Sequence, residues 1–338
     1  MKKVVIRGER KAELVEAPTP KAVKDWALVK IVVAPLCTEY KAYRDGEPSE
    51  CLGHEAAGEV VEVAQPGHVA VGDRVVVQPQ YPCGECPLCV RGEYIHCQQI
   101  YDIEDFTGSC EGGATYAQYI LKPSWLLTKI PDGVSYEHAG MVCCGLGPTF
   151  GAMERMKVDA FDTVLITGMG PVGLGGVING VFRGARVIAV VRNPYRANLA
   201  RELGAEAVVD PNDEDALQQI LDLTGGVGVD KAIDCAGDAS AQRLMIDATR
   251  RHGSAAFVGE SGALSIRVSD DMIRNGLTLH GIWHYNLGDV PKIMQVVQRS
   301  GGLLDTLITH TFPMSKVEEA WELQITRRCG KVILHPWE

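Results

Sequence analysis

Long hydrophobic runs are missing from this chain. The basic start MKKVVIRGER is not followed by an apolar stretch of signal-peptide length, and apolar runs such as VVVQPQY are strand-sized and broken by polar residues. The sequence therefore predicts neither a secretion signal nor a membrane span, and it favours a cytoplasmic location. Internal repeats and low-complexity tracts are also absent.

An excess of basic charge is missing as well. The formal net charge is −10 at pH 7, from 33 Lys and Arg against 43 Asp and Glu. A net negative chain is repelled by phosphate backbones and anionic lipid surfaces. The composition therefore argues against nucleic acid or membrane partners and leaves small molecules as the expected ligands.

The chain is long enough for two domains of ordinary size. It has 338 residues, of which 46% are hydrophobic and 22% charged, which suffices for cores that need no disulfides. In the first third, short β-branched runs alternate with turn residues, which predicts an all-β portion. The expected strands are Lys3–Ile6, Ala27–Val33, Ala57–Val63 and Arg74–Gln78.

From about Val158 the pattern changes to alternating strands and helices, which is typical of a parallel, doubly wound sheet. The expected elements are strand Thr163–Thr167, a helix ending near Arg183, strand Arg186–Val191, helix Ala197–Leu203, and strands Lys231–Cys235 and Ala255–Val258. After about Tyr285, two helices and a last strand are expected, at Val290–Arg299, Lys316–Ile325 and Lys331–Leu334.

Four of the eleven cysteines stand in the segment CGECPLCVRGEYIHC, with the spacing C-x2-C-x2-C-x7-C. Tetrahedral zinc takes four such soft ligands, and a site closed by four thiolates is structural rather than catalytic. Without a signal peptide, a cluster of this kind favours metal over disulfides. The predicted ligands are Cys83, Cys86, Cys89 and Cys97.

Three other interpretations of this cysteine row are open. Disulfides are one. An iron–sulfur cluster is another, but the bacterial ferredoxin run has its fourth cysteine three residues on and then a proline, whereas here the gap is seven and Gln98 follows. A nucleic-acid zinc ribbon would need basic neighbours, whereas Arg91 stands between Glu85 and Glu93. Structural zinc is favoured over all three.

The segment VLITGMGPVG carries the pattern G-x-G-x-x-G between an expected strand and an expected helix. In this context Gly168 makes the tight turn, Gly170 lets a pyrophosphate approach the backbone, and Gly173 lets the helix pack on the sheet. Free N–H groups at the helix start, around Pro171 and Val172, then hold the phosphates. The alternative is a packing turn that binds no ligand.

The second strand of this unit ends without the acid that would hold the ribose 2′-hydroxyl of NAD. It ends instead in Val191 and Arg192, and a guanidinium suits a 2′-phosphate. The sequence therefore favours NADP over NAD. The alternative is that Arg192 is only solvated and Arg196 covers the adenine face.

Several of these segments together resemble the zinc-containing alcohol dehydrogenases of the medium-chain dehydrogenase/reductase family. The resemblance covers essentially the whole chain. It rests on GHEAAGEVVEV from Gly53, GDRVVV from Gly72, the cysteine row, GGATYAQY from Gly112, CCGLGPTFGA from Cys143, the glycine pattern and GKVIL from Gly330.

This resemblance implies a GroES-like, mostly β catalytic domain plus a Rossmann cofactor domain with a doubly wound parallel sheet. The expected boundaries are 1–146 for the catalytic domain, 80–100 for its structural zinc lobe, 147–285 for the cofactor domain and 286–338 for the return to the catalytic domain. It also implies a homodimer or homotetramer, paired through the edge of the strand at 277–283.

The resemblance further implies a catalytic zinc held by Cys37, His54 and Cys144, with Glu55 beside it. Taken alone, Cys37 would be read as a small core residue. Cys144 matches the family position better than Cys143 because it directly precedes Gly145. Two thiolates and one imidazole leave a fourth position open, as a catalytic site requires, and the total becomes two zinc ions per chain.

The chain departs from the family just after the first ligand. The family usually has Cys-Gly-Ser/Thr-Asp, whereas here the run is Cys37-Thr38-Glu39-Tyr40. The histidine that some members use to pass a proton to solvent has no counterpart at Ala42. Thr38 is the expected proton relay, with Glu39 and Tyr40 as possible substitutes.

The sequence thus predicts an enzyme: a zinc alcohol or polyol dehydrogenase that moves hydride between a secondary alcohol, polyol or sugar and NAD(P). Trp283, His284 and Tyr285 follow the expected strand Leu277–Ile282, and they either line a site for a hydroxylated substrate or pack between domains. Acidic residues after the cysteine row either belong to a site or form a solvated loop: Asp102, Glu104 and Asp105.

Three rival functions stay open. A zinc-free quinone or enone reductase would share the fold and bind NADPH. A non-enzymatic zinc-ribbon interaction protein would bind no cofactor. A cluster-bearing redox protein would be coloured. Metal content separates all three from the zinc dehydrogenase.

Overall fold

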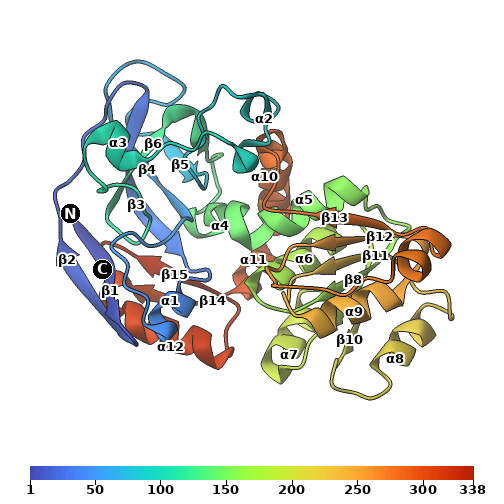
Figure 1. Cartoon of the computed structure of the whole chain (residues 1–338). Coiled ribbons are helices and arrows are strands. Elements are labelled where there is room, and N and C mark those ends of the chain that lie inside the picture. The colour runs from blue at the N-terminus through green and yellow to red at the C-terminus, as the bar shows by residue number, and fades with distance from the viewer. The chain divides into compact units, whose positions relative to one another are not determined.

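The computed structural model describes residues 1–338 and divides them into two compact units. Unit 1 contains Met1–Cys143, Asn286–Gln298 and Ile308–Glu338. Unit 2 contains Cys144–Tyr285 and Arg299–Leu307. Each unit is therefore built from stretches that are far apart in the sequence, and the chain enters and leaves unit 1 repeatedly (Figure 1).

Unit 1 is organised around β-sheets. Its strands are β1 (Lys2–Gly8), β2 (Lys11–Glu16), β3 (Trp26–Pro35), β4 (Ala56–Val63), β5 (Arg74–Val77), β6 (Tyr119–Pro123), β7 (Leu127–Lys129), β14 (Ile308–Pro313) and β15 (Lys331–His335). The larger sheet has the order β14-β15-β3-β4-β5-β7, with β6 also paired to β3, while β1 and β2 form a separate antiparallel pair. The long apolar strand β3 is almost wholly buried because it pairs with β4, β6 and β15.

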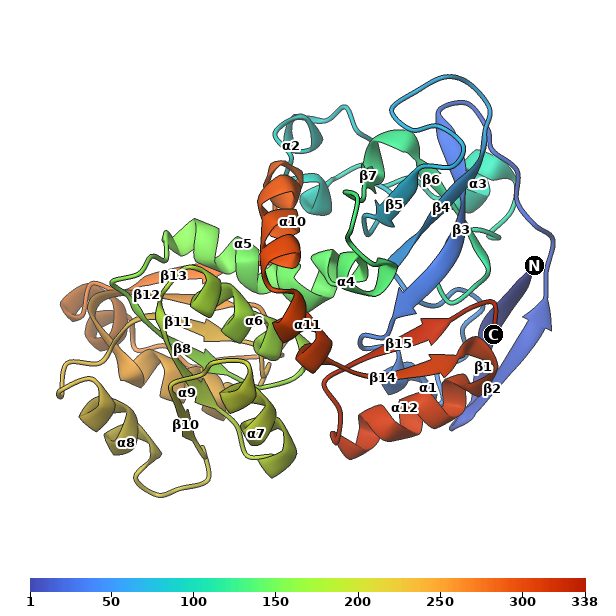
Figure 2. The same cartoon turned by 180° about the vertical axis from the view of Figure 1, so that it is seen from behind.

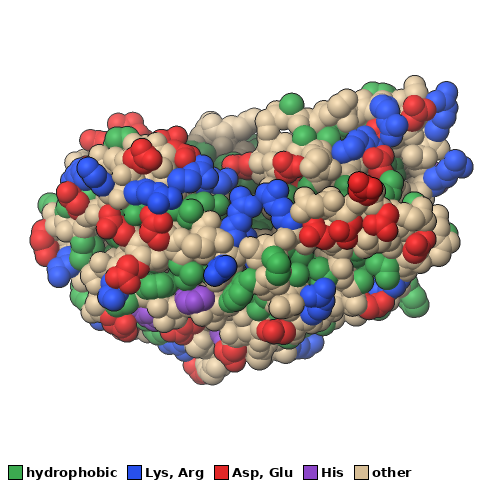
Figure 3. All heavy atoms as spheres, turned by 90° about the horizontal axis from the view of Figure 1, so that it is seen from below, with side chains coloured by type: hydrophobic (Ala, Val, Ile, Leu, Met, Phe, Trp, Pro, Cys, Tyr) green, Lys and Arg blue, Asp and Glu red, His purple; other side chains and the backbone are tan.

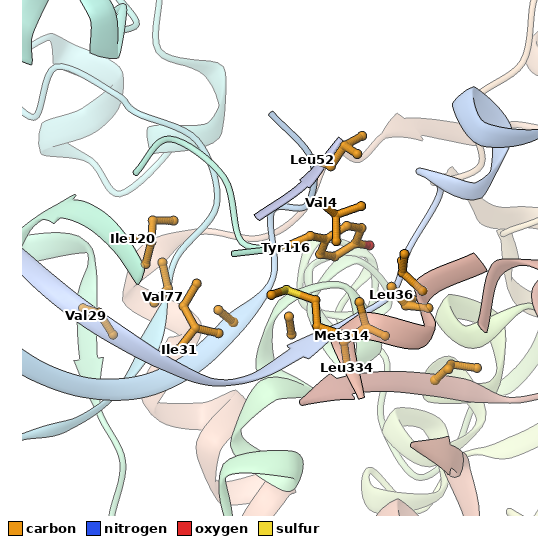
Figure 4. Packing of buried hydrophobic residues seen from close by; sticks show 14 of the residues in the cluster. Val4, Val29, Ile31, Leu36, Leu52, Val77, Tyr116, Ile120, Met314 and Leu334 are labelled. Atoms are coloured by element: carbon orange, nitrogen blue, oxygen red, sulfur yellow. The ribbon is translucent and has the colours of Figure 1, made fainter. Parts of the chain in front are cut away.

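Short helices connect these strands. They are α1 (Tyr40–Asp45), α2 (Pro87–Val90), η1 (Tyr94–His96), α3 (Ile103–Thr107), η2 (Ser124–Leu126), α4 (Tyr136–Gly140), η5 (Leu287–Asp289), α10 (Val290–Arg299), η6 (Met314–Lys316) and α12 (Val317–Thr326). Figure 4 shows the core that they and the strands enclose, where Val29, Ile31 and Leu334 converge with Tyr116 and Met314. The core thus joins N-terminal strands to the last strand of the chain.

Unit 2 is a six-stranded parallel sheet with helices on its faces. Its strands are β8 (Thr163–Thr167), β9 (Arg186–Val190), β10 (Ala207–Val209), β11 (Val229–Asp234), β12 (Thr249–Phe257) and β13 (Thr278–Gly281). Their order is β10-β9-β8-β11-β12-β13. The first strand, β8, therefore lies in the middle, which is the Rossmann order. Successive strands are added on one side of β8 up to β10 and then on its other side from β11, so the strand order reverses between β8 and β11.

Helices cover both faces of this sheet (Figure 2). They are η3 (Val142–Leu146, which begins at the end of unit 1), α5 (Gly147–Met156), α6 (Pro171–Phe182), α7 (Pro194–Glu202), α8 (Ala216–Leu223), α9 (Ala239–Ala248), η4 (Val268–Arg274) and α11 (Gly301–Leu307). Apolar residues of α8 and α9, such as Ile220 and Met245, share one core with Leu165 and Ile188 of the sheet. In an open sheet of this kind, ligands bind beyond the carboxyl ends of the strands at the reversal point.

The expected fold class, a mostly β portion followed by a Rossmann sheet, is confirmed. The bounds of β8 and α10 are those expected from the sequence, and β12 begins six residues earlier than its expected start at Ala255. The stretch after Tyr285 was expected to hold two helices and one strand, but it also contains α11 and β14. That expectation was incomplete because α11 begins with two glycines and β14 ends in proline, both weak signals for regular structure.

No helix in the structure has the length and apolarity needed to cross a membrane. On the face of the molecule shown in Figure 3, several basic side chains gather near the middle, and acidic side chains lie to both sides of them.

Candidate functional site

The four cysteines of the row converge in one place. The sulfur atoms of Cys83 and Cys89 lie 4.0 Å apart, those of Cys86 and Cys97 4.0 Å, and those of Cys97 and Cys83 3.6 Å. Four thiolates placed tetrahedrally at 2.3 Å from zinc would lie about 3.8 Å from one another. The geometry of the four sulfurs therefore fits a zinc ion.

Backbone N–H groups prepare these sulfurs to carry negative charge. The N–H groups of Cys83 and Gln99 donate to the sulfur of Cys97, each over 3.3 Å, and the N–H of Cys86 donates to Cys83 over 3.4 Å. The backbone N–H of Cys89 is the main reason that the pKa of Cys86 is lowered to about 6. Hydrogen bonds to the charged form favour thiolates, which are the form that binds metal.

The lobe that carries these cysteines is anchored to the rest of unit 1. Its buried residues Tyr94 and Ile95 form a small core with Leu126, and Leu287 packs against it. The side-chain amide of Asn286 donates to the carbonyl oxygen of Arg91 over 2.9 Å. The lobe therefore has a fixed position within its unit.

A second group combines four side chains from three places in the sequence. The ligand atoms of Cys37, His54, Glu55 and Cys144 all lie within 4.8 Å of one another. Cys37 follows β3, His54 and Glu55 immediately precede β4, and Cys144 lies in η3. Strand pairing between β3 and β4 thus brings the first three together, although 17 positions separate Cys37 from His54.

The structure distinguishes the two adjacent cysteines at 143 and 144. Cys143 has a non-helical backbone (φ −70°, ψ −112°) that breaks η3, and its thiol donates to the carbonyl oxygen of Val77 over 3.4 Å. Cys144, which is 4% exposed, is the one that belongs to the group. A kink in the backbone therefore turns neighbouring thiols in different directions.

Glu39 orients His54. One carboxylate oxygen of Glu39 lies 2.7 Å from Nδ1 of His54, and the other accepts from the Tyr116 hydroxyl over 2.7 Å and from the Cys37 N–H over 3.2 Å. A histidine whose Nδ1 donates to a carboxylate presents Nε2 as the metal ligand. This role of Glu39 was missed in the sequence, where it was considered only as a proton carrier.

The same contacts set the protonation of His54 without metal. Burial opposes the charged imidazole, but the hydrogen bonds with Cys37 and Glu39 outweigh it and raise the pKa of His54 to about 11. Without metal, His54 is therefore positively charged at neutral pH, in the place where a cation fits. Metal binding at such sites displaces protons from the ligands.

Glu55 has a buried cationic partner, Lys331 of β15. Both side chains are fully buried, and the Lys331 Nζ lies 2.6 Å from Oε1 of Glu55. Burial raises the pKa of Glu55 to about 7, while the Lys331 charge acts in the opposite direction. Lys331 was not among the residues expected from the sequence, because a lysine in a strand gives no local signal of a partner 276 positions away.

The residues after Cys37 have different surroundings from one another. Thr38 is exposed and does not belong to the metal-ligand group, while Tyr40 is partly buried and packs against the core of unit 1. Glu39 is engaged with His54 and Tyr116. Of the three candidates for carrying the proton, only Thr38 therefore has an exposed side chain.

The glycine pattern connects β8 to α6. Gly168 has φ +82°, and a Cβ there would lie 2.5 Å from the backbone nitrogen of Ala236, so this position requires glycine. A Cβ on Gly173 would lie 2.1 Å from the carbonyl oxygen of Gly168. A Cβ on Gly170, the N-cap of α6, would meet nothing within 4 Å. The fold itself therefore does not require glycine at 170, and the open space in front of Pro171 and Val172 suits a ligand phosphate.

Asp234 at the end of β11 holds the neighbouring loop in place. It accepts from the Thr167 hydroxyl of β8 over 2.9 Å, from the Ala236 N–H over 2.9 Å and from the Gln242 amide over 2.8 Å. These bonds join the carboxyl ends of β8 and β11, the two strands between which the strand order reverses. This role of Asp234 was not predicted from the sequence, because its partners lie on other elements of the fold.

The end of β9 carries Val191, which is buried, and Arg192, which is exposed. Arg192 lies close enough to Asp238 to lower the pKa of that carboxyl, although the main cause is the Ser240 side chain. Arg196 lies in the first turn of α7, and its N–H donates to the Asn193 side chain over 3.1 Å. No carboxylate follows β9 directly.

The remaining candidates show structural contacts. Trp283 is 45% exposed, whereas His284 and Tyr285 are buried. A Cβ on Gly151 of α5 would lie 2.5 Å from the His284 carbonyl oxygen, so this segment packs closely on α5. Asp102 caps α3 by accepting from the Glu104 N–H, and Asp105 lies in the first turn of that helix. The acidic residues after the cysteine row thus belong to a helix start.

Comparison with known proteins identifies both parts of the chain. The model described as "Alcohol dehydrogenase GroES-like domain" matches residues 23–132, and the model described as "Zinc-binding dehydrogenase" matches residues 171–299. The chain is 33% identical to the L-threonine 3-dehydrogenase of Pyrococcus furiosus, over 97% of this chain and 96% of that one. It is 30% identical to the sorbitol dehydrogenase of Bacillus subtilis, over 99% and 97%.

A solved structure of an alcohol dehydrogenase from Escherichia coli CFT073, in complex with NADH, is also similar. It superposes with a TM-score of 0.84 at 26% identity and covers 99% of each chain. The similarity therefore spans both units of the fold.

We expect Lys331→Met to leave Glu55 buried without its cation. Removing one partner of a buried ion pair costs about 3–5 kcal/mol, so the free energy of unfolding should fall by about that amount. Lys331→Arg, which keeps the charge, is the matched control and should lose much less. Urea unfolding of the zinc-loaded proteins measures both, and equal stability of all three proteins would contradict a structural role for this pair.

Proposed function

Because this chain belongs to the zinc-containing alcohol dehydrogenases of the medium-chain dehydrogenase/reductase family, we propose that it transfers hydride between a secondary alcohol bearing an adjacent polar group and NADP. It is an NAD(P)-dependent oxidoreductase that acts on alcohols or polyols. The grouping of Cys37, His54 and Cys144 beside a buried glutamate is the observation that carries this proposal. In the same proposal, 1–146 and 286–338 form the catalytic domain and 147–285 the cofactor domain.

Two zinc ions per chain are proposed. Cys83, Cys86, Cys89 and Cys97 would hold the structural ion, because their sulfurs have tetrahedral spacing and no open position. Cys37, His54 and Cys144 would hold the catalytic ion and leave one position open. When bound there, zinc supplies a Lewis acid that lowers the pKa of a coordinated hydroxyl group.

The protein residues around this site orient ligands and handle protons. Glu39 fixes the ring of His54, and Tyr116 fixes Glu39 from the core. Glu55 places a carboxylate beside the ligands, and Lys331 balances its charge. Thr38, with its exposed hydroxyl next to Cys37, would carry the proton from the substrate toward solvent.

The loop from Gly168 to Gly173 would hold the nicotinamide cofactor. Gly170 leaves room for a pyrophosphate, and the start of α6 at Pro171 and Val172 offers N–H groups and the positive end of a helix dipole. The cofactor supplies the hydride acceptor or donor, and the protein orients it.

The preference for NADP is proposed from charge. Val191 and Arg192 directly follow β9, where an acid would hold the ribose of NAD, and Arg196 lies in the first turn of the next helix. A guanidinium forms charge-assisted hydrogen bonds with a 2′-phosphate. A similar alcohol dehydrogenase was solved in complex with NADH, which lacks the 2′-phosphate. Kinetic measurements with NAD and with NADP are therefore the decisive test.

The substrate class is proposed from the activities of the relatives. Threonine, oxidised at its carbon 3, and sorbitol both have a hydroxyl whose neighbouring carbon carries a second polar group. A site that hydrogen-bonds such a second group rejects analogues that lack it. We extend this class to the present chain, together with a homodimer or homotetramer paired through the edge strand β13.

Metal analysis tests the zinc sites. We expect two zinc ions per chain, one of which is lost in Cys97→Ser and the other in His54→Ala. His54→Ala should abolish turnover while the affinity for NADPH, measured by fluorescence titration, stays nearly unchanged. Cys51→Ser, which removes a cysteine outside both groups, should keep both ions. A zinc-free wild-type enzyme that reduces enones would instead support the reductase alternative.

Kinetics with both cofactors test the role of Arg192. Arg192→Ala should raise the KM for NADP by about 10- to 100-fold, since a charge-assisted hydrogen bond contributes roughly 1.5–3 kcal/mol, and should leave the KM for NAD little changed. Arg201→Ala is the matched control, because Arg201 lies on the exposed part of α7 and its side chain donates to Asn198. A wild-type enzyme with a clear preference for NAD would refute the proposal.

A matched pair of alcohols tests the substrate class. 2,3-Butanediol and 2-butanol differ only in one hydroxyl on the adjacent carbon. We expect kcat/KM to be at least about tenfold higher for the diol, since an unpaired polar group in the site costs about 1–3 kcal/mol. Equal values for the two alcohols would show that the site does not recognise the second polar group.

A further inference from the structure

Two cysteines outside both metal groups lie together on the surface of unit 1. Cys51 is exposed and Cys110 is half-buried. The thiol of Cys51 donates to the carbonyl oxygen of Cys110 over 3.6 Å, and the Cys110 thiol lies near enough to contribute to raising the pKa of Cys51. They are 59 positions apart in the sequence, so the fold rather than the local chain brings them together.

Backbone hydrogen bonds hold the two segments in place on both sides of the thiol pair. The N–H of Tyr116 donates to the carbonyl of Leu52 over 2.8 Å, and the N–H of Thr115 donates to that of Gly53 over 3.2 Å. On the other side, Ser49 exchanges backbone hydrogen bonds with Ile6 of β1. Leu52, Val4 and Tyr116 lie close together at this place in Figure 4. The thiols are therefore kept near each other by the fold.

The pair also lies in a shallow depression of the surface. Cys51 and Cys110 line it together with Lys3, Glu50 and Glu111. The Lys3 Nζ lies 2.9 Å from Oε1 of Glu111 and 3.6 Å from Oε2 of Glu50. The carboxylates thus neutralise the lysine, and the two sulfur atoms are the nucleophilic groups of this depression.

We propose that Cys51 and Cys110 form a reversible disulfide by exchange with a small-molecule disulfide such as oxidised glutathione. The inference is independent of the proposed dehydrogenase function. Cys51, as the exposed thiol, attacks one sulfur of the small disulfide; a mixed disulfide forms and one small thiol leaves. Cys110 then attacks the Cys51 sulfur and releases the second small thiol. The protein loses two electrons and two protons, and one small disulfide becomes two thiols.

The surroundings of Cys51 make this exchange slow but favourable. Although Cys51 as a whole residue is exposed, the loss of water around its thiol, and next the neighbouring Cys110, raise the pKa of Cys51 to about 11, while Lys3 acts in the opposite direction. Thiolate is therefore scarce at neutral pH, which slows attack. In strongly oxidising disulfides the reduced form is stabilised, which favours reduction of the bond. A raised pKa means that the reduced form of Cys51 has no such stabilisation as a thiolate. Its disulfide should therefore persist once formed.

The bond would close a loop that contains the whole four-cysteine lobe, since Cys83 to Cys97 lie between the two partners. It would also tie the segment that leads to His54 to the segment that carries Tyr116. Closing a long loop stabilises mainly by restricting the unfolded chain. We therefore expect the oxidised protein to unfold at a higher temperature than the reduced one.

The test is to equilibrate the zinc-loaded enzyme with reduced and oxidised glutathione, block free thiols with N-ethylmaleimide, and map the peptides without reduction. We expect a Cys51–Cys110 cross-linked peptide, unchanged zinc content, and a thermal midpoint raised by roughly 5 °C that dithiothreitol reverses. Separate modification of Cys51 and Cys110, or cross-links only among the lobe cysteines, would overturn the proposal.

Variants sharpen the result. Cys110→Ser should stop the reaction at the mixed disulfide, so that glutathione accumulates on Cys51 and the thermal midpoint does not rise. Cys51→Ser should abolish both the cross-link and the shift. Cys235→Ser, which removes a thiol elsewhere, should keep both. A shift that persists in Cys51→Ser would show that another bond causes it. Because the wild-type peptide map needs no variant, poor folding of a variant leaves the test intact.

Discussion

The carboxylate of Glu39 connects the parts of the second metal-ligand group. One of its oxygens meets Nδ1 of His54, and the other accepts from the Tyr116 hydroxyl and the Cys37 backbone. Tyr116 is 1% exposed and lies in the core of unit 1, so its position is fixed by packing. The orientation of the imidazole therefore depends on a hydrophobic core, through one tyrosine and one carboxylate. This dependence explains how a site made from short connecting segments acquires a defined geometry.

The run after Cys37 shows how a shorter connection is accommodated. Members of the family that this chain resembles usually place an aspartate three residues after the cysteine, whereas here a glutamate stands two residues after it. The side chain of glutamate is longer by one methylene group, and it reaches His54 from the nearer position. Glu39 thus orients His54, and Thr38, whose side chain is exposed, is the proton carrier in the proposed function.

Local signals in the sequence predicted the Rossmann unit well. The strand Thr163–Thr167 and the glycines at 168 and 173 were predicted correctly in position, because a tight turn and a close helix contact restrict residue type locally. The four-cysteine row was equally clear because its ligands are adjacent in sequence. Lys331, Asp234 and the orienting role of Glu39 were missed, since each acts through a partner that only the fold brings near. The mostly exposed strand β2 was missed because it lacks an apolar alternation.

The pairing of Glu55 with Lys331 has a consequence for the order of assembly. Lys331 lies 276 positions after Glu55, so the ribosome synthesises it long after Glu55 and the cysteines around it. While the chain is still growing, the β3 and β4 segments can form, but burying Glu55 there would leave a carboxylate without its cation. Completion of the ligand group therefore waits for β15 to join the sheet. β15 therefore completes the surroundings of Glu55, and a chain without this strand would hold a buried carboxylate that lacks its cation.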